Sequence, residues 1–401
     1  MLYNPVRGSI FLSSPGSRWP FLLLCSFLIV WALLVSWLSG LLPVDQAAVE
    51  AAGVQTRVIQ AVSQEAVNRG LSIDLESDRH GTGLIGEVLT GLTSTQGNLP
   101  AKRTAATPDV AALLVALLRE AGVGEGSLVA VNASGSFPGF ALAAVSACGA
   151  LGADAVMVLS VGSSSWGANR PEFTILEMFM AAMDAGAWPP GYPAEIAALS
   201  PGGSDDRGLD LDPEALESAL DRAESLGIAV LRPQTLDEAV SLRMTLYRAG
   251  GEPDVLLTIG GNYAATGADP TLALLSGVIR PVELGRLGQV GSSGLVQDFL
   301  RAGLPVIQVL NIKELSTRYG LPHDPVVVPA IGKAGVYRHE LNSNGHSGAR
   351  LGFLVLALLP VAGAILVFAR YRRRIDESWS RRRDAGWVYP EDHRSAGHNH
   401  C

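Results

Sequence analysis

Residues 127–161 read SLVAVNASGSFPGFALAAVSACGALGADAVMVLSV, and this stretch decides the fold class. Its two ends, 127–133 and 155–161, are apolar runs of strand length, and a helix of small residues is predicted between them. Strand, helix and strand in this order form a βαβ unit, whose two strands run parallel. Unbroken apolar strands indicate burial on both faces. We therefore expect an α/β fold with a mostly parallel, Rossmann-like sheet and helices on both of its faces.

The residues around this unit continue the alternation of helices and strands. Helices are predicted at 47–70, 107–121, 172–185, 213–226, 235–249 and 292–302, and further strands at 228–231, 255–259 and 304–310. Two segments lack a clear period. Residues 83–104 are expected to hold loops, and the Pro- and Gly-rich residues 188–213 are expected to form a long connection.

Two long uncharged stretches bracket this region. The first, 19–44, lies between Arg18 and Asp45, and the second, 351–369, lies between Arg350 and Arg370. Each is long enough to cross the hydrocarbon core as a helix. The first could instead be a cleaved signal peptide, but its apolar core exceeds the ~7–15 residues usual for one. The sequence therefore predicts N- and C-terminal transmembrane helices that flank an α/β domain at 45–350.

The flanking charges predict the orientation in the membrane. Arg7 and Arg18 precede the first span, and the basic run RYRRR at 370–374 follows the second. Such flanks favour the cytoplasmic side. We therefore expect the terminal segments 1–18 and 370–401 to be cytoplasmic and the main domain to lie outside the cytoplasmic membrane.

The domain between the spans is acidic. Of the chain's 30 Lys and Arg and 38 Asp and Glu, the flanks hold 10 and 5, which leaves 20 and 33, a net charge of −13, for residues 44–350. A domain of this charge repels polyanions at long range, so no nucleic-acid partner is expected. The three cysteines, Cys25, Cys148 and Cys401, provide no pair inside the domain for a disulfide.

Three loops rich in glycine leave the carboxyl ends of predicted buried strands, at 134–139, 162–169 and 260–267. In open α/β sheets ligands bind at this edge, where the strand order reverses. Glycines let a ligand approach the backbone, and helix N-termini after such loops attract anions. The candidate ligand-binding side chains in these loops are neutral hydrogen-bonding groups, namely Ser134, Ser136, Ser163, Ser164, Asn169 and Asn262. The simpler alternative is that the loops are tight turns without a ligand.

Lys102 and Arg103 complete the candidate site, because the chain contains only three lysines, Lys102, Lys313 and Lys333. Two adjacent cations in a Gly- and Pro-flanked segment have the chemistry to bind carboxylates, the arginine through a fork of two hydrogen bonds and the lysine as a point charge. The alternative is a solvated pair in front of a helix.

The familiar catalytic and cofactor motifs are missing from the sequence. No G-x-S-x-G elbow surrounds Ser134 or Ser164, and no P-loop precedes Lys102 or Lys333. The glycines at 122–126 precede a strand, whereas a dinucleotide fingerprint precedes a helix. A Ser/His/Asp set with His80 or His323 is compatible with the chain order. No cofactor and no metal site are expected, and no catalytic residue is assigned.

Four segments in fixed order carry a family resemblance: GLIGEVLTGLTSTQGNLPAKRTAATPDVAALLVALLREAGV, VAVNASGSFPGFALAAVSA, SVGSSSWGANRPEFTILEM and LLTIGGNYAATG. Together they resemble the poly-gamma-glutamate system protein family over roughly residues 50–340. The most specific matches are LPAKRT at 99–104, SGSFP at 134–138 and GAN at 167–169. Trp166 stands where the family pattern has a tyrosine, and residues 93–96 hold fewer threonines.

The resemblance implies a membrane-anchored accessory protein of poly-gamma-glutamate synthesis or export. It implies the other proteins of that system as partners, and the glutamyl polymer itself as a ligand whose carboxylates the domain binds. It implies no catalytic residues. Two other functions remain open on the sequence: an extracytoplasmic hydrolase or transferase that acts on a gamma-glutamyl or cell-envelope substrate through the Ser-rich loops, and a scaffold for the membrane complex.

The predicted topology has a direct test. A reporter fused after Arg374 is expected to be active only in the cytoplasm, and one inserted near Gly203 only outside it, because positive flanks precede the first span and follow the second. Paired alkaline phosphatase and fluorescent protein fusions measure both positions. Cytoplasmic activity at Gly203 would contradict the two-span topology.

Overall fold

The computed structural model describes residues 25–34, 44–267, 269–286 and 294–338, together with isolated residues between 358 and 377. The chain divides into two units, one of residues 43–344 and one of residues 1–42 with 345–401. Among the described residues, no helix has both the length and the hydropathy that a membrane crossing requires. Most of the predicted spans 19–44 and 351–369 lies outside the described residues, so the two spans stay predictions.

A seven-stranded sheet forms the centre of the unit at 43–344, with the order β10-β11-β9-β2-β3-β7-β8. Six strands are parallel, and β10 alone pairs antiparallel, with β11. The mostly parallel α/β sheet is thereby confirmed. The strands are β2 (Leu128–Ser134), β3 (Asp154–Ser160), β7 (Ile196–Ser200), β8 (Ala229–Val230), β9 (Val255–Ile259), β10 (Gly277–Ile279) and β11 (Val306–Val309).

The strand order reverses between β2 and β9. From β2 the chain adds β3, β7 and β8 on one side, and it later places β9 and β11 on the other side. Both β3 and β9 therefore pair with β2, in parallel. The carboxyl ends of these three adjacent strands carry the three glycine-rich loops, which places the loops together at the switch point, where ligands bind in such sheets.

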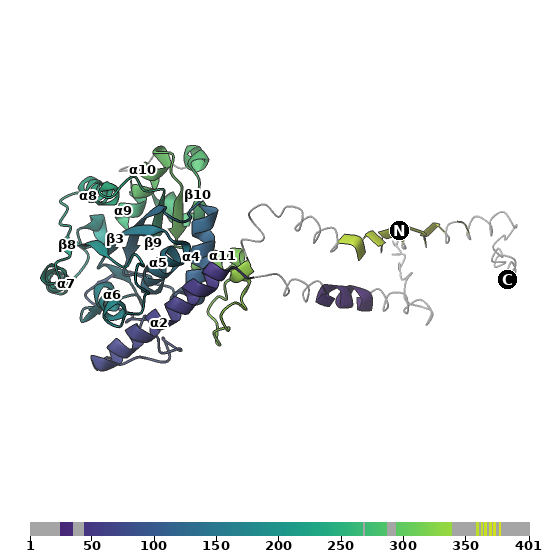
Figure 1. Cartoon of the computed structure of the whole chain (residues 1–401), viewed down its shortest axis with the longest axis horizontal. Coiled ribbons are helices and arrows are strands. Elements are labelled where there is room, and N and C mark those ends of the chain that lie inside the picture. The colour runs from purple at the N-terminus through teal and green to yellow at the C-terminus, as the bar shows by residue number, and fades with distance from the viewer. Residues whose placement is uncertain are drawn as a thin grey trace, which may run out of the picture. The chain divides into compact units, whose positions relative to one another are not determined.

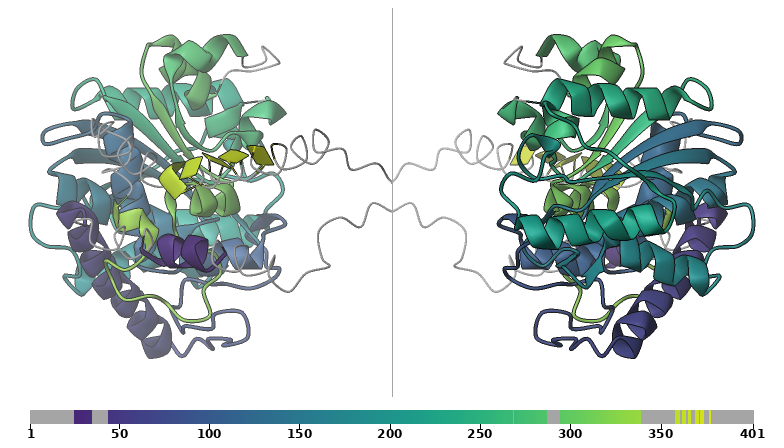
Figure 2. Two further views of the ribbon diagram at one scale, coloured as in Figure 1. Left: turned by 90° about the vertical axis from the view of Figure 1, so that its right-hand side faces the viewer. Right: turned by 90° about the vertical axis from the view of Figure 1, so that its left-hand side faces the viewer.

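Helices cover both faces of the sheet (Figure 1). The larger core lies against α2 (Gln46–Asn68), α4 (Asp109–Glu120), α5 (Pro138–Leu151), α6 (Ile175–Asp184), α7 (Pro213–Ser225) and α11 (Ile312–Tyr319), and the smaller core against α8 (Leu236–Arg248) and α10 (Leu295–Arg301). The two groups lie on opposite sides of the strands in the perpendicular views as well (Figure 2). In β2, Val129 and Val131 face the larger core and Ala130 faces the smaller one, as the pleat requires.

Three features differ from what the sequence predicts. Residues 83–104, expected to hold loops, contain a short strand β1 (Thr93–Thr95) and a helix α3 (Leu99–Ala105). The helix begins there because Asn98 accepts a hydrogen bond from the Ala101 amide and a proline occupies the first turn. The expected connection 188–213 contains β7, and β10 was not predicted. Both strands have at most five residues, too few to show a clear period.

A buried ion pair joins several strands beneath the loop edge. Arg243 of α8 and Asp206 are both fully buried, with Nη1 of Arg243 2.6 Å from Oδ2 of Asp206. The same guanidinium donates to Asn132 on β2 at 3.1 Å and to Ser200 on β7 at 2.6 Å. A buried charge is tolerated only when its partners satisfy it, and here one arginine satisfies polar side chains of two strands and a loop.

The Arg243→Met variant is expected to lower the free energy of unfolding by about 3–5 kcal/mol, because Asp206 is left buried without its partner. Urea denaturation of the full chain in detergent measures this. Arg248→Met is the matched control on the same helix, where the arginine is exposed and pairs with Glu252, and a change within about 1 kcal/mol is expected. Equal effects of the two changes would contradict the structural role of the buried pair.

Candidate functional site

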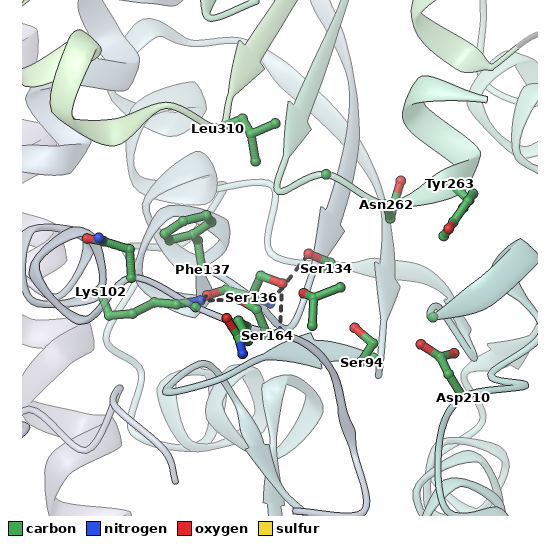
Figure 3. Close-up of a pocket in the computed structure, with 17 residues that line it drawn as sticks. Ser94, Lys102, Ser134, Ser136, Phe137, Ser164, Asp210, Asn262, Tyr263 and Leu310 are labelled. Atoms are coloured by element: carbon green, nitrogen blue, oxygen red, sulfur yellow. Dashed lines mark hydrogen bonds between the residues drawn. The ribbon is translucent and has the colours of Figure 1, made fainter. Parts of the chain in front are cut away.

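A pocket of about 300 Å³ opens at the switch point, at the carboxyl ends of the central strands. It lies between the β1–α3 segment, the loops after β2, β3 and β9, and the segment around residues 203–210 (Figure 3). Its labelled lining side chains are Ser94, Lys102, Ser134, Ser136, Phe137, Ser164, Asp210, Asn262, Tyr263 and Leu310. The polar lining is mostly neutral, with one lysine inside and one exposed aspartate, Asp210.

Backbone pairing between β1 and the loop after β3 brings Lys102 close to Ser164. Strand β1 pairs in parallel with β4 (Ser163–Ser164), and Thr95 is opposite Ser164. The Ser165 amide donates to the Thr95 carbonyl at 2.9 Å. Three residues separate β1 from helix α3, and Lys102 in this helix faces Ser164. A side chain at Gly97 would lie 2.2 Å from the Ser165 carbonyl oxygen and 3.1 Å from Cε of Lys102, so only glycine fits between them.

Lys102 is buried and contacts three groups of the pocket. Its residue exposure is 3%, and its Nζ lies 2.7 Å from Oγ of Ser164. The same nitrogen donates to the Ser136 carbonyl oxygen and sits 4.2 Å from the centre of the Phe137 ring. Burial lowers the pKa of the Lys102 amine from its ordinary 10.5 to about 7. Near neutral pH this amine is therefore present in both its charged and its neutral form.

The serines of the first two loops are connected by hydrogen bonds. The Ser164 amide donates to Oγ of Ser136 at 3.0 Å, and the Ser136 amide donates to Oγ of Ser134 at 3.4 Å. Gly260 makes room for this arrangement, because it adopts φ +86° and a Cβ there would lie 2.3 Å from Oγ of Ser134. The dashed contacts in Figure 3 run from Lys102 through these serines.

Asn262 contributes a free donor to the pocket. Its Oδ1 accepts from the Ala265 amide at 2.8 Å, which caps the short helix α9 (Tyr263–Thr266), and from Nδ2 of Asn132 at 3.0 Å. These two accepted bonds fix the orientation of the amide. Nδ2 of Asn262 is buried and has no hydrogen-bond partner in the described part of the chain. Because Asn132 is bound to Arg243, the buried network holds this donor in place.

Helix α5 also begins beside the pocket. Its N-cap is Phe137, which lines the pocket and provides no capping side-chain hydrogen bond, and Pro138 follows in the first turn. The positive end of this 14-residue helix therefore lacks a side-chain cap. Together with Lys102 and Nδ2 of Asn262, it makes the pocket favourable for an anionic group.

The structure separates the residues that the sequence groups as one site. Lys102, Ser134, Ser136, Ser164 and Asn262 line the pocket, and their binding role stays a prediction. Ser163, Asn169 and Arg103 are not among its lining residues.

Each of the three residues outside the lining makes a contact elsewhere in the domain. Oγ of Ser163 donates to the Ser164 carbonyl, and the fully buried Asn169 side chain exchanges two hydrogen bonds with the Glu87 backbone. Arg103 donates to the Ser77 carbonyl at 2.9 Å and lies 3.6 Å from Asp324. Lys102 and Arg103 thus point to different surroundings, because successive residues of a helix are about 100° apart.

The sequence analysis did not assign three other residues to the site, namely Arg243, Asp210 and Tyr263. Arg243 was detectable, since it falls on the buried stripe of its helix with Ala239, Val240 and Tyr247, where a charge needs a partner. Asp210 and Tyr263 carried no local signal, because long-range packing alone brings them to the pocket. His80 and His323, the histidines considered for a catalytic set, do not line the pocket. His80 contacts the Pro325 carbonyl instead, at 3.1 Å.

No family model matches the chain, and no match was found among curated proteins. What the domain can bind follows from the residues that line the pocket. Its chemistry has two components: an anion-compatible set of donors, and an amine of lowered pKa in hydrogen-bond contact with a serine hydroxyl.

Proposed function

We propose that residues 45–350 form an extracytoplasmic carboxylate-binding domain of a membrane-anchored accessory protein for poly-gamma-glutamate synthesis or export. The observation that carries the binding function is the buried Lys102 amine, which lies in a pocket whose other polar side chains, apart from the exposed Asp210, are neutral. A glutamyl carboxylate presents two acceptor oxygens, which match an ammonium group together with amide and hydroxyl donors.

The free N–H donor of Asn262 favours a ligand that carries a hydrogen-bond acceptor. A buried N–H without a partner is unfavourable, by about 1–3 kcal/mol, and a ligand oxygen removes that cost. The uncapped start of α5 adds its partial positive charge at the same pocket. Asp210, exposed at the other end in Figure 3, repels a carboxylate and favours its placement beside Lys102.

The polymer assignment and the membrane location rest on the sequence. The four segments that resemble the poly-gamma-glutamate system proteins include LPAKRT and SGSFP, which contain Lys102, Ser134, Ser136 and Phe137 of the pocket. The basic flanks and the two uncharged stretches support a membrane anchor with both termini in the cytoplasm. The net charge of the domain requires that a polyanion be held locally, through the pocket, since long-range attraction is absent.

The Lys102→Met variant is expected to weaken binding of a fluorescent γ-linked glutamate oligomer about tenfold or more, because a charge-assisted hydrogen bond contributes roughly 1.5–3 kcal/mol. Fluorescence anisotropy with the full chain in detergent measures the affinity. Binding is expected to weaken as the pH rises through 7, where the ammonium form of Lys102 is lost. It is also expected to weaken with salt.

Two further variants sharpen this experiment. Lys313→Met removes an exposed lysine outside the pocket and is expected to leave the affinity unchanged. Asn262→Asp keeps an oxygen for the Ala265 and Asn132 donors but replaces the free N–H by a negative oxygen, so it is expected to abolish binding. Equal affinity of the parent, Lys102→Met and Asn262→Asp, or no binding by the parent at low salt, would contradict carboxylate recognition and favour a scaffold.

A further inference from the structure

We propose that Ser164 is an acyl-accepting nucleophile and Lys102 its general base, so that the pocket cleaves γ-glutamyl amides or esters and transfers the acyl group to water or to an amine. The choice of a γ-glutamyl substrate rests on the proposed function. The nucleophile and its base rest on the geometry alone.

The geometry satisfies the first requirement for a serine nucleophile, contact with a base. Oγ of Ser164 lies 2.7 Å from Nζ of Lys102, within the range for proton transfer, and both groups line the pocket. The lysine is held from two further sides, by the Ser136 carbonyl and the Phe137 ring. The backbone pairing of β1 with β4 holds Ser164 opposite Thr95, in the segment that leads into the helix of Lys102.

The neutral amine is the form of Lys102 that can act as the base. A neutral lysine has two N–H groups and one lone pair. In the ammonium form, Nζ donates to both the Ser136 carbonyl and Oγ of Ser164. In the neutral form, one N–H serves the Ser136 carbonyl and the lone pair can accept the Ser164 hydroxyl proton across the same 2.7 Å contact. The pKa of Lys102, lowered to about 7 by burial, leaves this form abundant near neutral pH. A general base is most effective when its pKa lies near the working pH.

The charged groups around Lys102 do not cancel the effect of burial, which lowers its pKa. Desolvation is the cause of its lowered pKa. Arg103, the next residue of α3, pairs with Asp324, and Asp210 accepts the Ser204 amide with Oδ1 at 2.6 Å. The titratable groups on the other elements packed around α3 and the pocket include Tyr263, the first residue of α9, Cys148 on α5 and, on α11, Lys313, Glu314, Arg318 and Tyr319.

The reaction balances with the groups present. Oγ of Ser164 forms a bond to the carbonyl carbon as its proton passes to Nζ of Lys102. The carbon–nitrogen bond of an amide, or the carbon–oxygen bond of an ester, then breaks, and the Lys102 ammonium returns the proton to the leaving amine or alcohol. Water or a second amine attacks the resulting serine ester, gives its proton to Lys102, and the released Ser164 oxygen takes that proton back. The positive end of α5 lies beside the pocket, where an oxyanion would develop.

Hydrolysis would leave a carboxylate product next to the same lysine. The ammonium form of Lys102 binds this product, and the amine form activates Ser164. One residue therefore gives two opposite pH dependences. Carboxylate binding falls as the pH rises through about 7, and acylation rises over the same range.

Intact mass spectrometry of the full chain in detergent tests the nucleophile with two probes, a fluorophosphonate and a γ-glutamyl 4-nitrophenyl ester. We expect a single adduct, located on Ser164 by peptide mapping, whose rate of formation rises through about pH 7. Ser164→Ala is expected to lose it, and Lys102→Met to slow it at least a hundredfold, the usual lower range for general base catalysis. Ser241→Ala, an exposed serine of α8 outside the pocket, is expected to react as the parent does.

Circular dichroism checks the fold of each variant, and Ser164→Cys, which conserves volume, is a second replacement expected to move the adduct to the thiol. An adduct on another serine, an unchanged rate in folded Lys102→Met, or no adduct with either probe in the folded parent would overturn the nucleophile. That result leaves oligomer binding intact. Labelling of Ser164 by the fluorophosphonate but not by the γ-glutamyl ester supports the nucleophile and overturns the γ-glutamyl substrate.

Discussion

The burial of one amine governs the chemistry of this pocket. The Lys102 amine is desolvated and contacts a carbonyl, a hydroxyl and an aromatic ring instead of water. This desolvation lowers its pKa to about 7. The surrounding fold supports that placement at each level. Asn98 caps the helix that carries the lysine, the β1–β4 pairing holds Ser164 opposite Thr95, and Gly97 leaves the space between Lys102 and the Ser165 carbonyl. The buried Arg243 network orients the donor of Asn262 at the same pocket.

The sequence was sufficient for the mostly parallel α/β class and for the loops at the carboxyl ends of the central strands. Unbroken apolar runs such as 155–161 reveal buried parallel strands, and a glycine-rich loop after each one marks the carboxyl edge. Short elements were not predictable in the same way. Strand β7 and helix α3 are too short for a periodic pattern, and pairing with distant residues or a single cap stabilises them.

The sequence predicted which loops lie at the pocket, but it did not predict which of their side chains line it. Ser134, Ser136, Ser164 and Asn262 of the three loops line one pocket, whereas Ser163 and Asn169 of the same loops form hydrogen bonds with backbone groups and do not line it. The binding role of these residues stays a prediction. Chain neighbours can face different surroundings, as Lys102 and Arg103 do. The sequence therefore suggested a pair of cations, whereas the structure places one amine against one hydroxyl. That contact depends on β1–β4 pairing between segments about 70 residues apart in the chain, which no local pattern reveals.

The ionisation of Lys102 is the most direct test of the central claim. The chain has only three lysines, so NMR of protein labelled at lysine Cε gives few signals, and the Lys102→Met variant assigns the relevant one. The chemical shift of that signal, followed against pH in the full chain in detergent, is expected to titrate with a midpoint near 7. A midpoint near 10.5, the ordinary value for lysine, would contradict a buried amine that exchanges a proton with Ser164.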